Sequence, residues 1–256
     1  MQSLVISLSS AVDRRQHIEN EFALKGVNFE FFDAITPDLA RQLANDMNLI
    51  IDDELLTAGE LACLMSHVSI WKKIVDENIP YLAVFEDDIY LGEDAAKIFS
   101  SSDWLQVDWD IIKTESFADK VFLGKDSTSI LNGKRQVTQL LSKNLGTAGY
   151  ILSIKGAQVY LEYIKSSPLI PIDQIMFSEF ILKQKTKVYQ LCPAICIQEM
   201  ILFPKQKTVL SSDLIQERNI RLRKNKKKGW AKVQLEIMRI VKQLKFAILG
   251  TFIGYK

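Results

Sequence analysis

The sequence of 256 residues has few of the side chains that build disulfide frameworks and zinc sites, with three cysteines and two histidines in all. Cys192 and Cys196 have three residues between them, one more than a redox Cys-x-x-Cys pair, and no histidine cluster accompanies them. We therefore expect the three cysteines, Cys63 included, to be buried free thiols in a protein that stays in a reducing cytosol.

Long apolar runs are missing as well. No uncharged apolar stretch approaches the roughly 18 residues that indicate a membrane-spanning helix. The apolar run at residues 4–8 is followed by Arg14 and Arg15, whereas a signal peptide places its positive charges first. The Gly-x-x-x-x-Gly-Lys-Ser/Thr pattern of a phosphate-binding P-loop is also absent from the sequence. We expect a protein that is made and kept on the cytosolic side of the membrane.

The net charge of +1 conceals a strong asymmetry along the chain. Residues 1–204 hold 18 Lys and Arg against 28 Asp and Glu, a balance of −10, whereas residues 205–256 hold 14 against 3, a balance of +11. The hydrophobic content of 48% is sufficient for a substantial core. These numbers predict an acidic folded domain over residues 1–204 and a basic tail over residues 205–256 that meets something anionic.

The tail combines a dense basic cluster at residues 218–228 with an amphipathic pattern after Trp230. The apolar residues that recur there at helical spacing are Val233, Ile237, Ile240, Val241, Leu244, Ile248 and Phe252. A basic amphipathic helix is typical of an interfacial membrane anchor, so we expect residues 218–253 to contact an anionic membrane surface. The alternative is a helix that docks on the body or pairs with a second subunit. No nucleic-acid partner is expected, because no recognition motif accompanies the charge.

The first 204 residues alternate between strand and helix patterns. We expect strands at residues 3–8, 27–32, 81–85, 109–115, 146–153, 187–191 and 194–198, with a β-ribbon within residues 117–144. Helices are expected up to about residue 25 and at residues 38–48, 61–78, 94–99, 155–166 and 174–184. This alternation predicts an α/β fold with a mostly parallel central sheet flanked by helices.

Three consecutive acids follow the strand expected at residues 81–85. Ligands of open α/β sheets bind beyond the carboxyl ends of the strands, so Glu86, Asp87 and Asp88 lie where a site is expected. If the backbone stays extended, Glu86 and Asp88 share one face and Asp87 takes the other. Two carboxylates on one face repel each other unless a cation lies between them, and oxygen ligands suit magnesium or manganese. The alternative is a solvated acidic turn.

Two earlier segments carry further candidates. The β-α-β opening brings the ends of its two strands together, so Arg14 and Arg15 could reach a diphosphate there, or else lie on a solvated helix face. The spacing of Thr57 and Glu60 predicts a capping box at the start of the helix at residues 61–78. His67 lies between apolar positions of that helix, where a structural role competes with a role in the site.

The order of these motifs resembles glycosyltransferase family 25, the bacterial lipopolysaccharide or lipooligosaccharide glycosyltransferases related to the galactosyltransferases that modify collagen. The most specific part is the block from Gly59-Glu60 through Cys63 to Ser66-His67, followed by Glu-Asp-Asp at residues 86–88. The other matching segments are Val5-Ile-Ser-Leu with Arg14-Arg15, Phe32-Asp33-Ala34, Gly146-Thr-Ala-Gly149-Tyr150, Pro171-Ile-Asp173-Gln and Gln198. The resemblance covers nearly all of residues 1–200 and leaves the basic tail outside.

The resemblance implies a GT-A-type nucleotide-binding domain, a UDP-sugar donor carrying galactose or glucose, inversion at the anomeric carbon, and a divalent metal, Mn²⁺ or Mg²⁺. It assigns the metal to Asp88 first, with Glu86 or Asp87 assisting at the metal, the ribose or both, and Glu86 preferred as the second metal ligand. The remaining matching positions would bind the donor: Ser7, Arg14, Arg15, Asp33, Glu60, Ser66, His67 and Asp87.

Inversion by direct displacement needs a base opposite the leaving group that takes the proton of the acceptor hydroxyl. Asp173 is the candidate for this base, because it follows a proline-constrained loop late in the chain. Its alternative role is the N-cap of the helix at residues 174–184. Glu115 is the reserve candidate for the base.

The sequence thus predicts a metal-dependent inverting hexosyltransferase, with β-galactosyl transfer as the first choice and glucosyl transfer as the second. The acceptor is the oligosaccharide of a lipid-linked precursor in lipopolysaccharide or lipooligosaccharide biosynthesis, and the enzyme is peripheral on the cytosolic face of the inner membrane. One alternative is a nucleotidyl- or phosphotransferase using the same acids, which the missing P-loop disfavours. The other is a catalytically weak sugar- or nucleotide-binding scaffold, which the intact Glu-Asp-Asp disfavours.

Overall fold

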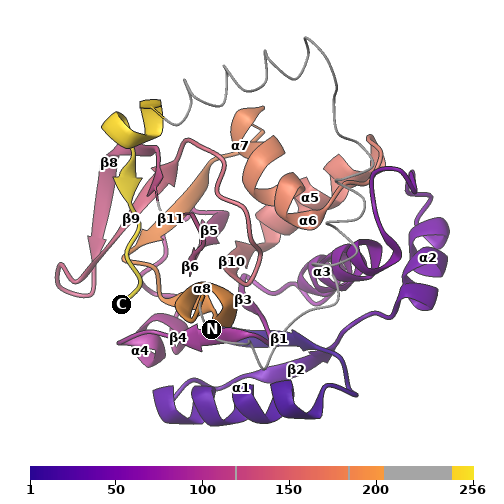
Figure 1. Cartoon of the computed structure of the whole chain (residues 1–256), viewed down its shortest axis with the longest axis horizontal. Helices are drawn as coiled ribbons and strands as arrows, with labels where there is room; N and C mark the ends of the chain where they lie inside the picture. Colours follow the sequence, from indigo (N-terminus) through magenta and orange to yellow (C-terminus); the bar gives the residue numbers. More distant parts are fainter. Residues whose placement is uncertain (119, 184, 205–243) are drawn as a thin grey trace.

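A computed structural model describes residues 1–118, 120–183, 185–204 and 244–256 of the chain. Its central feature is an eight-stranded sheet with the order β2-β1-β3-β10-β5-β11-β9-β8 (Figure 1). The strands are β1 (Gln2–Ser7), β2 (Glu30–Asp33), β3 (Tyr81–Glu86), β5 (Ile111–Lys113), β8 (Leu123–Ile130), β9 (Arg135–Leu140), β10 (Gly149–Ser153) and β11 (Val188–Cys192). The predicted α/β class, with helices flanking a large central sheet, is confirmed.

The central sheet is mixed, which corrects the prediction that it is mostly parallel. Among the described strands, β1 pairs in parallel with β2 and β3, and β5 pairs in parallel with β11, whereas the other four pairings are antiparallel. The causes are β10, which enters antiparallel between β3 and β5, and the β8–β9 hairpin, which extends the sheet beyond β11. The direction of a strand depends on distant partners, so the residue pattern of the strand itself does not reveal it.

Side chains of β3 alternate between two separate cores. Leu82 and Val84 face the core that α2 (Pro37–Asp46), α3 (Ala58–Asp76) and α5 (Ile154–Lys165) cover. On the opposite face, Phe85 packs edge-on against Phe22 of α1 (Val12–Lys25) and Phe99 of α4 (Ala95–Phe99). The acids after β3 therefore follow a strand that is buried on both faces, as a central strand of an α/β sheet should be.

The helices expected from the sequence are present, except that the one near residue 177 is broken. The predicted capping box is confirmed at the start of α3, where Thr57 Oγ1 accepts from the N–H of Glu60 at 3.1 Å and Glu60 Oε2 accepts from the N–H of Thr57 at 3.0 Å. The helix expected at residues 174–184 is divided into α6 (Ile172–Gln174), a π-type turn η1 (Ile175–Glu179) and α7 (Phe180–Leu182), with non-helical backbone at Phe177. No helix among the described residues is long and apolar enough to cross a membrane.

The strand expected at residues 109–115 is divided between two sheets. Its first part is β5, and its end is β6 (Glu115–Ser116), which pairs with β12 (Cys196–Gln198). The other side of β12 pairs with β4 (Ile89–Leu91), and the short helix α8 (Glu199–Leu202) follows. Because β4 begins directly after Asp88, this three-stranded sheet borders the acids at the end of β3.

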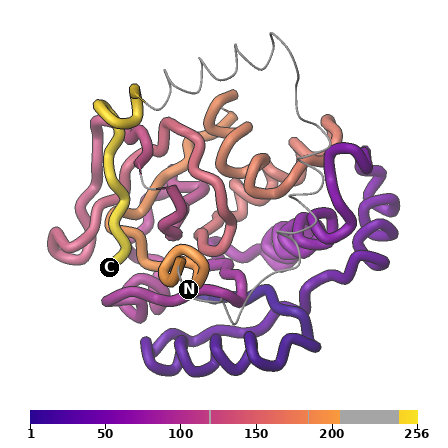
Figure 2. Tube along the Cα trace, in the orientation of Figure 1, coloured from indigo at the N-terminus to yellow at the C-terminus, as the bar shows by residue number. Residues whose placement is uncertain are grey.

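The last described residues lie against the body of the domain. β13 (Thr251–Phe252) pairs antiparallel with β7 (Lys120–Val121), and Ile253 is 2% exposed. Figure 2 shows this yellow segment running beside the β8–β9 hairpin. Phe252 therefore lies in a strand, which corrects its placement on the amphipathic helix; the described helical residues of the tail are 244–249. The basic cluster at residues 218–228 lies outside the described residues, so the division at residue 204 stays a prediction.

Candidate active site

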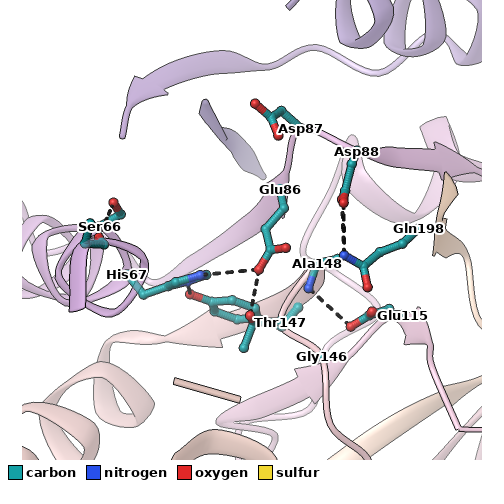
Figure 3. A network of polar contacts seen from close by, with 12 residues as sticks. Ser66, His67, Glu86, Asp87, Asp88, Glu115, Gly146, Thr147, Ala148 and Gln198 are labelled. Atoms are coloured by element: carbon teal, nitrogen blue, oxygen red, sulfur yellow. Dashed lines mark hydrogen bonds and ion pairs between the residues drawn. The ribbon is translucent and has the colours of Figure 1, made fainter. Parts of the chain in front are cut away.

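The three acids after β3 point to two sides of the chain (Figure 3). β3 ends at Glu86, and Asp87 and Asp88 form the turn before β4. Glu86 and Asp88 extend to one side, toward Thr147 and Gln198, while Asp87 points away from both. The structure thus shows the alternation that the sequence predicts for these residues.

Asp87 contacts two residues that the resemblance assigns to the donor site. The hydroxyl of Ser7, at the end of β1, donates to Asp87 Oδ2 at 2.7 Å. The guanidinium of Arg14, near the start of α1, forms an ion pair with Asp87 Oδ1. The β-α-β opening therefore does bring its strand ends together, and Arg14 faces the acids instead of a solvated helix face.

Arg15 binds a different acid at the same edge of the sheet. Its Nη2 pairs with Asp33 at the end of β2 and donates to the carbonyl of Ser7 at 3.0 Å. Its Nε donates to the carbonyl of Leu8 at 3.1 Å, and the guanidinium carbon lies 4.6 Å from the centre of the Phe31 ring. Arg15 thereby ties the ends of β1 and β2 together next to the acids.

Glu86 contacts α3 and the segment that leads into β10. The hydroxyl of Thr147 donates to Glu86 Oε1 at 2.6 Å, and His67 Nε2 lies 3.7 Å from the same oxygen. Burial acts to raise the pKa of Glu86, but the His67 ring, the Thr147 hydroxyl and the Lys113 ammonium outweigh burial, so the pKa is lowered. Glu86 is therefore a carboxylate whose Oε1 the protein already orients.

His67 has no exposed surface, and its ring is fixed in the core. Its Nδ1 lies 2.8 Å from the hydroxyl of Tyr150, which also accepts from Trp71 Nε1 at 3.3 Å. Its Nε2 faces Glu86 and has no hydrogen-bond partner among the described residues. The sequence left a structural role and a role in the site as competing alternatives for His67. The structure shows that the side chain packs in the core and also lies beside the acids.

Asp88 carries the least compensated charge of the three acids. Gln198 Nε2 donates to Oδ1 and to Oδ2 of Asp88, at 3.2 Å each. Burial and then the negative charge of Glu86 raise the pKa of Asp88 to about 7, although Arg14 and Gln198 act to lower it. A divalent cation beside Asp88 would supply the missing positive charge, and carboxylate oxygens are ligands that Mn²⁺ and Mg²⁺ accept. Asp88, with Glu86 as its neighbour, therefore fits the metal that the family implies.

Glu115 has no exposed surface. Its Oε2 pairs with Lys113 Nζ at 2.6 Å and accepts from the N–H of Ala148 at 3.2 Å, and Lys113 also donates to the carbonyl of Gly146 at 2.6 Å. Burial raises the pKa of Glu115 to about 7, although Lys113 acts to lower it. A fully buried carboxylate does not meet an acceptor hydroxyl, so this geometry argues against Glu115 as the base and makes it a support for residues 146–148.

Asp173 lies inside the first turn of α6, and the N-cap of that turn is Pro171. The alternative role of Asp173 as an N-cap is therefore wrong. Its side chain is 7% exposed, and its charge, after burial and after Glu86, raises the pKa of the Cys63 thiol. Asp173 thus lies near the acids of β3, although it comes from a distant part of the sequence.

Glu60 and Ser66 make structural contacts at α3. Glu60 closes the capping box, and its charge is among those that raise the pKa of Cys63. Ser66 Oγ donates to the carbonyl of Ala62 and accepts from the N–H of Ile35, both at 2.9 Å. Ser66 therefore fixes the loop after β2 to α3, and Figure 3 shows it apart from the three acids.

Several contacts of the site come from residues to which the sequence assigned no role. Thr147 is 61 positions from Glu86, and Gln198 is 110 positions from Asp88. Lys113 stands out in the sequence as a charged residue after the apolar residues 111 and 112, which is a signal for a buried ion pair. Thr147 offers a weaker signal, because a polar residue after a glycine is also common in turns.

Comparison with known proteins places these residues in a family. Residues 1–176 match the model of glycosyltransferase family 25 (LPS biosynthesis protein). The lacto-N-neotetraose biosynthesis glycosyltransferase LgtE of Neisseria meningitidis serogroup B is 39% identical, over 85% of this chain and 82% of that protein. The lipooligosaccharide biosynthesis protein lex-1 of Haemophilus influenzae is 33% identical, over 96% of this chain and 93% of that protein. The resemblance seen in the motifs is confirmed: the chain belongs to glycosyltransferase family 25.

Proposed function

We propose that the chain is a metal-dependent, inverting hexosyltransferase that moves galactose, or else glucose, from a UDP-sugar to the oligosaccharide of a lipid-linked acceptor. Family membership supports glycosyl transfer, and the names of the relatives, which refer to lacto-N-neotetraose and lipooligosaccharide biosynthesis, support the acceptor class. The observation that best supports a metal-dependent mechanism is the cluster of carboxylates at the end of β3. There, burial and the charge of Glu86 raise the pKa of Asp88 to about 7.

Asp88 is the principal metal ligand in this proposal, and Glu86 assists it. Mn²⁺ or Mg²⁺, when bound, neutralises the charge that develops on the leaving diphosphate. Gln198 orients Asp88 by donating to both of its carboxylate oxygens, and Thr147 orients Glu86. Both acids are therefore held in place before the donor arrives, which lowers the cost of organising the site.

The nucleotide is assigned to the edge formed by the ends of β1, β2 and β3. Two arginines lie there, and each is paired with one acid, Arg14 with Asp87 and Arg15 with Asp33. The Asp33 side chain is 73% exposed, so its carboxylate is open to ribose hydroxyls while Arg15 stays fixed by main-chain carbonyls. The hydroxyl of Ser7 is the other polar group of this edge.

The donor sugar is assigned to the side of Glu86 that faces α3. His67 is the side chain of that helix whose Nε2 lies 3.7 Å from Glu86 Oε1. Glu60 and Ser66 act on this pocket as positioning residues, because their hydrogen bonds hold the start of α3 and the loop after β2. Asp173 is the proposed base, since its charge acts on the thiol of Cys63, which lies within 4.8 Å of the Glu86 carboxylate, while the reserve candidate Glu115 has no exposed surface.

Nucleotide-sugar specificity and metal dependence are tested together. The thermal unfolding midpoint and the rate of donor hydrolysis are measured with UDP-galactose, UDP-glucose and UDP-N-acetylglucosamine, each with Mn²⁺ and with a chelator. We expect UDP-galactose to stabilise the protein most, and the stabilisation to disappear with the chelator. The configuration of the anomeric carbon in a transfer product, read by NMR coupling, tests inversion.

Each result of this panel has a distinct meaning. A response to UDP alone that needs the metal keeps the nucleotide site and removes the assignment of the sugar. A response that survives the chelator contradicts the metal role of Asp88. No response to any nucleotide contradicts the transferase and favours a binding scaffold.

We also propose that the enzyme works at the cytosolic face of the inner membrane through its basic stretch. Residues 205–256 carry 14 Lys and Arg against 3 Asp and Glu, and cations near anionic headgroups stabilise a peripheral protein. The test replaces the Lys and Arg of residues 218–228 by Gln and measures sedimentation with anionic vesicles. Replacing the exposed Lys72 and Lys165 by Gln is the control. Equal sedimentation of both variants would show that the stretch does not hold the protein on the membrane.

A further inference from the structure

A second group of possible metal ligands lies beside Asp88, and it includes sulfur and nitrogen atoms as well as oxygen. Cys63, His67 and Glu86 each contribute one atom to a cluster in which all ligand atoms lie within 4.8 Å of one another. Cys63 and His67 are one turn apart on α3 and project from the same face of the helix, and Glu86 meets them from the end of β3. A thiol and an imidazole are softer ligands than the oxygens around Asp88.

The spacing between His67 and Glu86 fits two ligands of a tetrahedral metal centre. His67 Nε2 and Glu86 Oε1 are 3.7 Å apart, which is too long for a hydrogen bond. Zinc bonds of about 2.0–2.1 Å to nitrogen and oxygen place two tetrahedral ligands about 3.4 Å from each other. The observed gap is therefore close to the distance that an ion between the two atoms would set.

The hydrogen bonding of His67 Nε2 gives an independent reason to expect a ligand at this position. The residue has 0% exposed surface, and its Nε2 is a buried polar atom without a hydrogen-bond partner among the described residues. Buried polar atoms in folded proteins nearly always have a partner, so an unpartnered nitrogen aimed at an acid calls for an explanation. A cation bound to Nε2 is such an explanation.

Neighbouring side chains hold two members of the group, His67 and Glu86, in place through hydrogen bonds. His67 Nδ1 is 2.8 Å from the hydroxyl of Tyr150, so the ring can donate there while Nε2 carries the metal. Thr147 donates to Glu86 Oε1 at 2.6 Å and fixes the orientation of the carboxylate. Partners of this kind usually strengthen metal binding by fixing the ligands.

We propose that Cys63, His67 and Glu86 form a second cation site that selects a thiophilic divalent ion such as Zn²⁺. Three protein ligands leave a fourth position open, and the thiol of Cys63 releases its proton to solvent when its sulfur binds the ion. Mn²⁺ and Mg²⁺, which prefer oxygen ligands, are disfavoured by the sulfur and the nitrogen. The site is therefore chemically distinct from the one assigned to Asp88.

The site has a consequence for activity that rests on the proposed function. Glu86 belongs to both groups, so Zn²⁺ on Cys63 and His67 withdraws Glu86 from the ion at Asp88. Zn²⁺ then inhibits transfer in the presence of Mn²⁺, and a zinc chelator reverses the inhibition. The binding of Zn²⁺ itself does not depend on what the enzyme transfers.

The test uses Co²⁺ as a spectroscopic probe of the full-length protein. We expect the wild type to show the visible and thiolate-to-cobalt absorption of a tetrahedral, sulfur-containing site, and Zn²⁺ to displace the Co²⁺. Cys63→Ser should lose the thiolate band and weaken binding by about 10-fold or more. Cys192→Ser is the matched control and should keep the band. Cys192 is also a partly buried thiol, but among the described residues it belongs to no cluster of possible metal ligands.

Two results would overturn the proposal: a wild-type protein without the thiolate band, or a band that Cys63→Ser retains. Thermal unfolding of the apo-proteins shows whether each variant folds; if Cys63→Ser does not, Cys63→Ala and His67→Gln replace it with the same expected loss. Failure of the donor panel with Mn²⁺ leaves the cobalt spectrum unaffected, so the proposed function and the cation site fail separately.

Discussion

Thr147 and Glu86 are joined by a side-chain hydrogen bond, although 61 positions separate them. The Thr147 hydroxyl donates to Glu86 Oε1 at 2.6 Å, and the N–H of Glu86 donates to the carbonyl of Ala148, next to Thr147, at 3.1 Å. Lys113 holds the same segment from its other side through the carbonyl of Gly146. The orientation of a proposed metal acid thus depends on a segment that is itself fixed by a buried ion pair.

Replacing Thr147 by Val should therefore impair the enzyme without unfolding it. Valine has nearly the same shape but cannot donate to Glu86, so we expect kcat to fall about 10-fold and the Mn²⁺ concentration for half-maximal activity to rise by a similar factor. Steady-state kinetics over a range of Mn²⁺ measures both. Thr147→Ser retains the hydroxyl and should recover most of the activity. Equal kinetics of the Val and Ser variants would show that the hydrogen bond has no role.

Replacing Asp88 by Asn should remove most of the activity. The amide keeps the size of the side chain but loses the charge, so we expect kcat/KM to fall by about 100-fold or more, which corresponds to about 2.7 kcal/mol of transition-state stabilisation. Asp126→Asn, on the exposed part of β8, controls for the loss of one negative charge. Undiminished turnover of the Asp88 variant would remove the metal role of this acid, and calorimetric titration with Mn²⁺ would show whether binding is lost with it.

Removing one partner of the buried Lys113–Glu115 ion pair should destabilise the protein strongly, whereas replacing both partners should not. Lys113→Met leaves the fully buried Glu115 without its cation, so we expect the free energy of unfolding at pH 8 to fall by about 3–5 kcal/mol. The double variant Lys113→Met/Glu115→Gln should recover most of this loss. Urea denaturation measures both, and Lys72→Met, which breaks an exposed pair with Asp76, should change stability by less than about 1 kcal/mol. A single variant as stable as the double variant would contradict the assigned coupling.

Glu115 should also make stability depend on pH in a defined window. Burial raises its pKa in the folded protein to about 7, from the value of 4.5 that applies to an unperturbed glutamate. The folded state therefore holds a proton in this range that the unfolded chain has lost, so stability falls as the pH rises from about 4.5 to about 7 and then levels. The contribution is about 3 kcal/mol.

The double variant Lys113→Met/Glu115→Gln isolates this contribution, because it does not titrate at position 115. The difference in unfolding free energy between wild type and double variant, measured by urea denaturation at pH 4.5, 6 and 8, should shift against the wild type as the pH rises. A constant difference across the three pH values would show that Glu115 does not titrate in this window.

The last strand offers a test of how firmly residues 251–256 bind the domain. Ile253 is 2% exposed, whereas its neighbour Phe252 is 68% exposed. Ile253→Ala should therefore lower the free energy of unfolding by about 2–4 kcal/mol, and Phe252→Ala on the same strand by less than about 0.5 kcal/mol. Equal effects in thermal and urea denaturation would mean that the strand does not pack against the body in solution.

The features that could be predicted from the sequence are mostly those that depend on residues close together in the chain. The capping box of Thr57 and Glu60 depends on residues three apart, and the burial of β3 follows from its five apolar residues, so both were predictable. The acids were located for the same reason, because a site is expected where such a strand ends. The family resemblance added the proposed donor residues at the ends of β1 and β2.

The remaining features depend on contacts between distant segments. Nothing near β10 in the sequence indicates that it enters antiparallel between β3 and β5, and this placement made the sheet mixed. Similarly, Glu115 resembles an available acid until Lys113 and Ala148 are seen around it. Phe252 continues a helical spacing, but pairing of its strand with β7 overrides that local pattern.

The docked end of the chain changes how the basic stretch can act. The N–H of Ala194 donates to the carbonyl of Gly254 at 2.8 Å, and the buried Arg135 donates to the carbonyl of Lys256. The described chain is therefore attached to the domain on both sides of residues 205–243, at α8 before them and at β13 after them. If the basic stretch binds the membrane as proposed, these two attachments would restrain the rotation of the domain, and acceptor lipids would meet the same side of the enzyme at every encounter.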